Sequence, residues 1–310
     1  MGSLTQESGS SSVTAIGSAA KSPAAQPRRE GVRRRALRRF VHHKAALAGV
    51  GVLVLTATLA IAAPIIAPHD PNLTRVDLRN MPPGNSYLLG TDGIGRDVLS
   101  RLLFAGQVSL AVGISAAFVA TAIGLVVGLI AGTIGGLVDM LAMRLTDIVL
   151  SVPSLIAIAI VTGLMGGGFW VVVLVLGLFG WTEAARVVRA ELLSLREQEF
   201  MIAARGLGAN HLWVIRKHLL FYALPPLTVT GTFTVARALL TEAGLSFLGI
   251  GVQPPQATWG NMLTDAQSLN VLTSLPWLWI PPGMAIFITV VAVNLVGDGL
   301  RDALDPHEVS

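Results

Sequence analysis

The chain of 310 residues contains no cysteine and few charged residues. Without cysteine it can form neither disulfides nor thiolate zinc sites nor iron–sulfur clusters. Charged residues make up 13% of the chain and hydrophobic residues 53%, whereas a soluble domain carries about 25% charged residues. The net charge of +4 is small, and the basic residues gather in two segments instead of coating a face, which argues against nucleic-acid binding. The composition therefore indicates an integral membrane protein.

Catalytic motifs are also lacking. The sequence has no GxxxxGK[ST] phosphate loop, no HExxH and no GxSxG. The six histidines are dispersed, apart from the pair His42-His43. An intramembrane protease or transferase is therefore weakly supported, and we expect a chain that is no enzyme and holds no metal or cofactor of its own.

Long apolar stretches are present instead, and each is near or above the roughly 20 residues that a helix needs to cross a bilayer. Backbone in lipid must satisfy its own hydrogen bonds, so such stretches are helices. The sequence thus predicts an all-α membrane protein with six transmembrane helices. The expected spans are Ala45–Ala67, Val108–Ile134, Val138–Leu164, Trp170–Val188, Leu224–Phe247 and Trp277–Val296.

The N-terminal residues 1–40 are expected to form a disordered, basic tail, and residues 41–67 the first transmembrane helix. Arginines and lysines crowd the end of this tail. A nucleic-acid-binding arm is one interpretation, but an anchor on the cytoplasmic side of the first span is favoured. A cleaved signal peptide is not favoured, because the apolar run exceeds the roughly 7–15 residues of such a region. The basic residues are Arg28, Arg29, Arg33, Arg34, Arg35, Arg38, Arg39 and Lys44.

This anchor places both termini in the cytoplasm and residues 68–104 outside, where acidic and basic residues balance. Within that loop, residues 96–101 are expected to form a short helix on the membrane surface. Residues 105–306 would hold the other five spans. Their cytoplasmic segment 186–217 is basic, in agreement with the orientation, and the external segment 249–276 is expected to cover the outer mouth as a re-entrant or interfacial piece.

Small residues are frequent within the spans. Gly124, Gly128, Gly132 and Gly136 recur at every fourth residue, a pattern that lets helices approach closely. The stripe fits packing within the subunit and an interface with a second subunit equally well.

Ionisable residues within a span are functional-site candidates by default. Asp147, Glu183 and Glu242 lie toward span ends, Arg237 lies in mid-span, and Asn294 is a polar neighbour. Either they line a wet pathway or they pair, for example Asp147 with Arg144 and Glu183 with Arg186. An ion-coupled transporter would need carboxylates nearer the bilayer centre. Pro153 is expected to kink the third span and is the last pathway candidate.

The polar segment Leu195–Leu220 lies between two spans. Ala203 and Ala204 belong to a predicted helix that ends before Gly208, and a second helix follows Asn210. Leu207, Leu212 and Trp213 could fill a groove in a partner. A plain solvated loop would have no need of these apolar residues beside a glycine bend.

Within this segment, IAARGLGA (Ile202–Ala209) resembles the EAA loop of binding-protein-dependent ABC importer permeases. Ala203, Ala204 and Gly208 match that signature at its spacing. Ile202 stands where the family usually has glutamate, and Glu199 lies about one turn earlier. Phe221 stands where a proline commonly ends the motif.

Six motifs, one of which contains this segment, resemble the dipeptide/oligopeptide permease family, and within it the second permease subunit. The likeness covers roughly residues 38–306. The motifs are LGTDGIGRDVLSRLLF, RLTDIVLSVPSL, LREQEFMIAARGLGA, LTEAGLSFLGIGVQPP, WGNML and NLVGDGLRDALDP.

The resemblance implies an ABC type I importer in the cytoplasmic membrane, working by alternating access. This chain would pair with a second permease, two cytoplasmic ATPases that bind ATP and Mg, and an extracytoplasmic peptide-binding protein, and would contact lipid and peptide but no nucleic acid. Nickel, glutathione or another small solute is the alternative cargo, and an ion-coupled secondary transporter is the alternative class. The residues implied in ATPase coupling are Glu199, Ala203, Ala204, Arg205, Leu207, Gly208, Ala209, Leu212 and Trp213.

Overall fold

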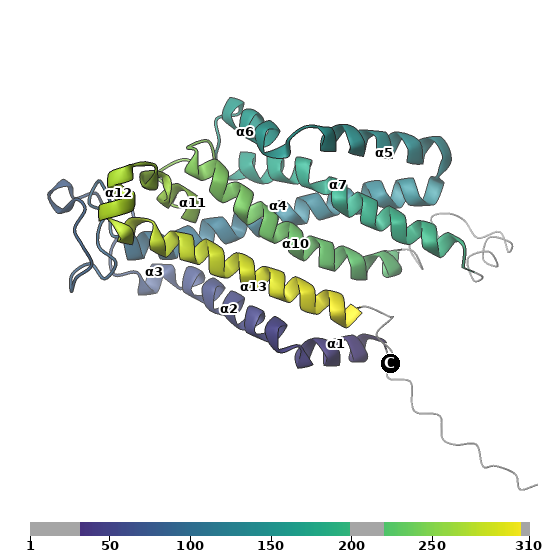
Figure 1. Ribbon diagram of the computed structural model, residues 1–310, viewed down its shortest axis with the longest axis horizontal. Coiled ribbons are helices and arrows are strands. Elements are labelled where there is room, and N and C mark those ends of the chain that lie inside the picture. The colour runs from purple at the N-terminus through teal and green to yellow at the C-terminus, as the bar shows by residue number, and fades with distance from the viewer. Residues whose placement is uncertain (1–31, 199–219, 305–310) are drawn as a thin grey trace, which may run out of the picture.

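The computed structural model describes residues 32–198 and 220–304, without the side chains of residues 32–36 and 221. This part of the chain is helical, with one isolated β-bridge between Thr91 and Asp97. Long helices run along one axis, the short helices gather at one end, and the described chain ends lie at the other (Figure 1). The long elements are α1 (Val32–His42), α2 (Lys44–Ile61), α4 (Val98–Ile134), α5 (Gly136–Ser151), α6 (Ser154–Leu164), α7 (Phe169–Arg196), α10 (Leu220–Phe247) and α13 (Ile280–Leu304).

Helix α4 is the centre of the bundle and contacts α2, α5, α7 and α10. It runs unbroken for 37 residues, about 55 Å, so it extends beyond about 30 Å of hydrocarbon. The expected surface helix over residues 96–101 is wrong as a separate element. Asp97 caps α4 by accepting a hydrogen bond from the Ser100 N–H, so the residues from Val98 onward are its first turns.

The glycine stripe of α4 packs against α7. A Cβ on Gly128 would lie 2.7 Å from the Ala185 carbonyl oxygen, and one on Gly132 would lie 2.8 Å from the Leu192 Cβ. The stripe thus serves packing within the subunit, one of the two possibilities left open by the sequence. Gly136 is different, because a Cβ added there would meet nothing within 4 Å, and it begins α5 at φ +58°.

Four helical stretches of the described residues are long and apolar enough to cross a membrane: α2, α4, α7 and Pro276–Leu304. The pair α5 and α6 would make a fifth span, bent by 83° at Val152-Pro153. This bend confirms the break expected at Pro153. Helix α10 has 28 residues and two internal prolines, Pro225 and Pro226, so the expected count of six spans stays a prediction.

The N-terminal helix α1 packs against α13. Residues 32–40 are helical, although the sequence predicts them to be part of a disordered tail. His43 separates α1 from α2 and accepts a hydrogen bond from the Ala46 N–H at 3.0 Å. Its Nε2 lies 3.3 Å from the Asp302 carboxylate on α13, which ties the start of α2 to the end of α13.

The segment after α10 folds into four short helices at the end of the bundle opposite the described termini (Figure 1). Buried Trp259, Met262 and Leu278 from this segment pack with Val98 and Ala105 of α4. The segment is therefore a packed cap on α4, α10 and α13. Its elements are α11 (Trp259–Met262), η3 (Thr264–Gln267), α12 (Leu269–Ser274) and η4 (Pro276–Leu278); earlier in the chain, α3 (Ala63–Ile66) and η1 (Val76–Leu78) precede α4.

Candidate functional site: a charged cavity between the long helices

A cavity of about 340 Å³ lies among α4, α5, α6, α7 and α10. The α10 residues on it recur at helical spacing, so one face of that helix forms a wall. The α7 residues follow the same rule on the opposite side. The lining residues are Ala116, Leu150, Ser154, Ile158, Leu176, Phe179, Gly180, Thr182, Glu183, Arg186, Thr234, Arg237, Ala238 and Thr241.

Two ion pairs join helices across this cavity. Arg237 of α10 pairs with Glu183 of α7, and Arg186 of α7 donates to the Asp147 carboxylate of α5 at 2.6 Å. Pairing is thus confirmed, but the expected partners, Arg144 for Asp147 and Arg186 for Glu183, are wrong. Sequence neighbours on one helix are the obvious candidates, whereas the structure pairs residues on different helices.

These four side chains remain about half exposed, between 48% and 57% in the isolated chain. A charged side chain at the centre of a lipid-facing helix costs about 2.5–3.5 kcal/mol on insertion scales. Such residues face water or another protein surface instead of hydrocarbon. The face that carries the cavity is therefore the polar face of the bundle.

Helix α5 packs loosely on α7 and is held there by charge. Besides Asp147–Arg186, the Arg189 guanidinium donates to the Asp139 carboxylate at 2.6 Å. Thr146 is the one buried residue of α5. The bend at Pro153 then turns α6 across the cavity, where Ser154 and Ile158 complete the lining.

The cavity takes in part of the predicted pathway set. Glu183 and Arg237 line it, Asp147 joins through Arg186, and Pro153 precedes the lining residue Ser154. Glu242 is 1% exposed and lies in a separate polar network, and Asn294, on α13, is not among the lining residues. Sequence reasoning missed the hydroxyls of Thr234 and Thr241, although their spacing from Arg237 on one helical face was a readable signal.

The predicted coupling residues, from Glu199 to Trp213, lie outside the described residues. The segment that contains them joins the end of α7 to the start of α10. Both of those ends lie at the end of the bundle opposite the cap of short helices (Figure 1).

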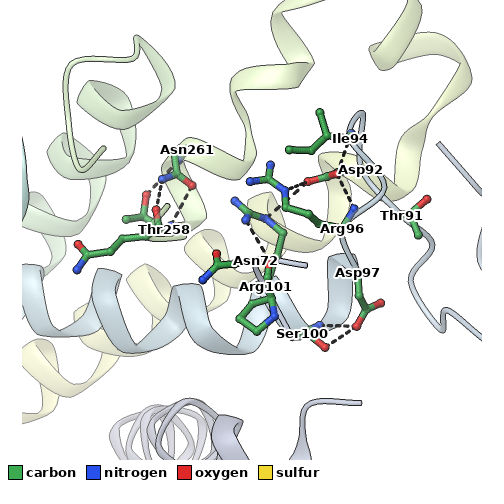
Figure 2. A network of polar contacts seen from close by, with 12 residues as sticks. Asn72, Thr91, Asp92, Ile94, Arg96, Asp97, Ser100, Arg101, Thr258 and Asn261 are labelled. Atoms are coloured by element: carbon green, nitrogen blue, oxygen red, sulfur yellow. Dashed lines mark hydrogen bonds and ion pairs between the residues drawn. The ribbon is translucent and has the colours of Figure 1, made fainter. Parts of the chain in front are cut away.

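A second polar cluster fixes the loop before α4 at the capped end (Figure 2). The Asp92 carboxylate accepts hydrogen bonds from Arg96 Nε at 2.6 Å and from the backbone N–H groups of Ile94 and Arg96. Arg101 Nε lies 3.7 Å from the same carboxylate, and Arg101 also donates to the Pro71 carbonyl. This cluster gives the motif LGTDGIGRDVLSRLLF a structural role, since it holds the loop before α4 against the first turns of that helix.

The fold and the charged cavity define a class: a multi-span α-helical membrane protein with a polar face between its helices. Comparison with known proteins defines it further. Residues 124–309 match the family model described as "Binding-protein-dependent transport system inner membrane component". Residues 32–83 match "N-terminal TM domain of oligopeptide transport permease C".

Known proteins are similar in sequence to this chain over most of their own length. A protein of Brucella suis biovar 1 named as a peptide permease is 41% identical over 281 residues, 91% of this chain and 93% of the relative. The "Oligopeptide transport system permease protein OppC" of Bacillus subtilis is 38% identical over 271 residues, 87% of this chain and 88% of the relative. The chain belongs to the family of binding-protein-dependent transport system inner membrane components; it is a membrane permease subunit and not an enzyme. The resemblance drawn from the motifs is confirmed.

Proposed function

We propose that the chain is the second permease subunit of an ATP-driven importer that carries di- or oligopeptides across the cytoplasmic membrane by alternating access. The observation that carries the proposal is the cavity between α7 and α10, which is lined by paired charges of both signs. The family supplies the machinery, and the relatives named for peptides supply the cargo class.

A peptide suits this cavity chemically. Its free ammonium and carboxylate ends can exchange with the partners of an ion pair, and Glu183 and Arg237 offer one of each sign. The apolar walls at Leu176 and Phe179 accept varied side chains, and Thr234 and Thr241 can bond to main-chain groups. The volume of about 340 Å³ lies at the lower end of the range for ligand sites, about 300–1,000 Å³, as suits one subunit's share of a pathway.

The connectivity suits alternating access. Residues 197–219 join α7 to α10, and these two helices carry Glu183 and Arg237 on facing walls of the cavity. A partner ATPase that moves this connection acts on both walls at once. The remaining partners would be a sister permease and a peptide-binding protein at the external cap, with both termini of this chain in the cytoplasm.

Two adjacent positions on α10 test whether the cavity is a wet pathway. The chain has no native cysteine, so Thr241→Cys and Leu240→Cys can each be labelled alone in the assembled transporter. Thr241 lines the cavity, whereas Leu240 is exposed on another face of the helix. We expect a membrane-impermeant thiol reagent to modify Thr241→Cys faster, and excess peptide to slow that reaction. Equal rates, or a faster reaction at Leu240→Cys, would refute the pathway.

The cargo is tested separately with the whole transporter and its binding protein. Labelled di-, tri- and pentapeptides, glutathione and nickel are offered in turn to proteoliposomes. We expect ATP-dependent uptake of peptides. Uptake of glutathione or nickel without uptake of peptides would support the same type of transporter but contradict the proposed peptide cargo.

A further inference from the structure

Glu242 is a buried carboxylate that the cavity does not use. It lies on α10, five residues before the helix ends, and is 1% exposed. Within the described ranges, no lysine or arginine forms an ion pair with it. A buried carboxylate without a cation is costly unless several donors satisfy it, so its hydrogen bonds show what it does.

Two hydroxyl groups donate to this carboxylate. Ser246 Oγ, one turn along α10, donates to Oε1 at 2.7 Å. Ser109 Oγ of α4 donates to Oε2 at 3.4 Å. One carboxylate therefore joins α10 and α4.

Each of these hydroxyls also accepts a backbone N–H from the cap. Ser246 Oγ accepts from Val252 N at 3.2 Å, and Ser109 Oγ accepts from Trp259 N at 3.1 Å. Within the cap itself, Thr258 Oγ1 accepts from Asn261 N at 3.0 Å, a contact drawn in Figure 2. A hydroxyl has one hydrogen to donate and lone pairs to accept with. Because the hydrogens go to Glu242, the lone pairs are left to face the amides, and each relay strengthens the bonds along it.

Glycines bring the cap backbone directly onto α10. A Cβ on Gly260 would lie 2.6 Å from the Ala243 Cα, and one on Gly251 would lie 2.7 Å from the Ser246 nitrogen. The Trp259 indole also donates to the Leu102 carbonyl of α4 at 3.2 Å. No side chain separates the cap from the helix at these contacts, so the relays act across closely packed backbones.

We propose that Glu242 is a positioning residue that fastens residues 251–262 of the cap to α10 and α4 through two hydroxyl relays, so that the cap and the outer end of α10 form one unit. Arg237 lies five residues earlier on the same helix. A partner that docks on the cap therefore acts on the helix that carries a wall of the cavity. This consequence for transport rests on the proposed function, whereas the fastening does not.

The test measures how well Glu242 keeps the cap packed against α10 and α4. Glu242→Gln keeps the volume of the side chain but replaces one acceptor oxygen with an amide NH2, which cannot accept from a hydroxyl. In the cysteine-free chain, a single Ala257→Cys reports on the cap, and a single Ala303→Cys reports on the opposite end of the bundle. The two alanines are matched in burial, at 6% and 7% exposed.

We expect Glu242→Gln to speed maleimide labelling of Ala257→Cys by about tenfold or more in the assembled transporter, because a buried hydroxyl loses its acceptor. Labelling of Ala303→Cys should stay unchanged. Ser109→Ala retains the charge and removes one relay, so it should speed labelling of Ala257→Cys by a smaller factor; it also carries the test if Glu242→Gln does not assemble.

Unchanged labelling of Ala257→Cys in both variants would overturn the proposal. An equal increase at Ala257→Cys and Ala303→Cys would overturn it as well, since that result describes general loosening of the fold. The measurement needs neither cargo nor ATP, so its failure is distinguishable from a failure of the proposed peptide transport.

Discussion

Gly128→Ala places one methyl group into the contact between α4 and α7. Its Cβ would lie 2.7 Å from the Ala185 carbonyl oxygen and 2.7 Å from the Val188 Cβ. Carbon atoms in favourable contact are about 3.5–4.0 Å apart, so the overlap is about 0.8–1.3 Å. Backbone at Ala185 cannot rotate away, and the two helices must separate.

Separation by 0.5–1 Å forfeits about a quarter to a half of each contact energy along the interface. Overpacking of this kind costs about 1–3 kcal/mol, and the better helix propensity of alanine returns up to about 1 kcal/mol. We expect a net loss of about 1–2 kcal/mol of unfolding free energy. Gly51→Ala is the matched control, because Gly51 lies in the interior of apolar α2 and its Cβ would meet nothing within 4 Å.

Unfolding by sodium dodecyl sulfate from mixed micelles measures both variants. The midpoint for Gly128→Ala should fall clearly below that of the wild type, and the midpoint for Gly51→Ala should stay level or rise. Equal midpoints for the two variants would refute the close α4–α7 packing. A normal midpoint for Gly128→Ala together with loss of the sister permease would instead assign the stripe to an interface between subunits.

Three further predictions concern coupling and charge. Gly208→Val should remove the bend of the coupling segment, so uptake should fall sharply while the chain still inserts; wild-type uptake with normal ATPase coupling would contradict the segment's role. Glu199→Ala should weaken ATPase association in co-purification, because Glu199 stands near the position of the missing motif glutamate, and unchanged association would mark it as a solvated charge. Glu183→Gln, Arg237→Gln and the double variant should show a coupling of about 0.2–1 kcal/mol in a detergent-unfolding cycle, as exposed ion pairs do, because the pair is about half exposed; a coupling below about 0.2 kcal/mol would show that the pair contributes nothing.

The long helices can be predicted from the sequence because a run of about 20 apolar residues fixes a membrane helix by length alone. Pro153 is informative as well, since a proline in the interior of a helix removes an N–H and kinks or ends the helix, although α10 continues through Pro225 and Pro226. The extension of α4 back to Val98 is not predictable in this way. The polar motif before it is typical of a loop at the membrane surface. That Asp97 is the N-cap of α4 is visible only from the position of its carboxylate in the structure.

Charge pairing depends on information that helical spacing does not contain. Asp147 and Arg186 are 39 residues apart in sequence, and the bend at Pro153 and the reversal after α6 bring them together. The same holds for Glu242: the sequence marks it as a polar group near the end of its span, but its hydroxyl partners come from two helices, Ser109 of α4 and Ser246 of α10. Likewise, the spacing of the glycines in the α4 stripe does not show which helix they face. The structure shows that they face α7.

Reconstitution tests directly whether this chain imports peptides at the expense of ATP. Proteoliposomes that hold this chain, its sister permease and both ATPases, with loaded binding protein outside, are assayed for uptake of a labelled peptide. We expect uptake that requires hydrolysable ATP and persists when proton and sodium gradients are collapsed. Uptake by this chain alone, without ATP and driven by an ion gradient, would contradict the proposed function.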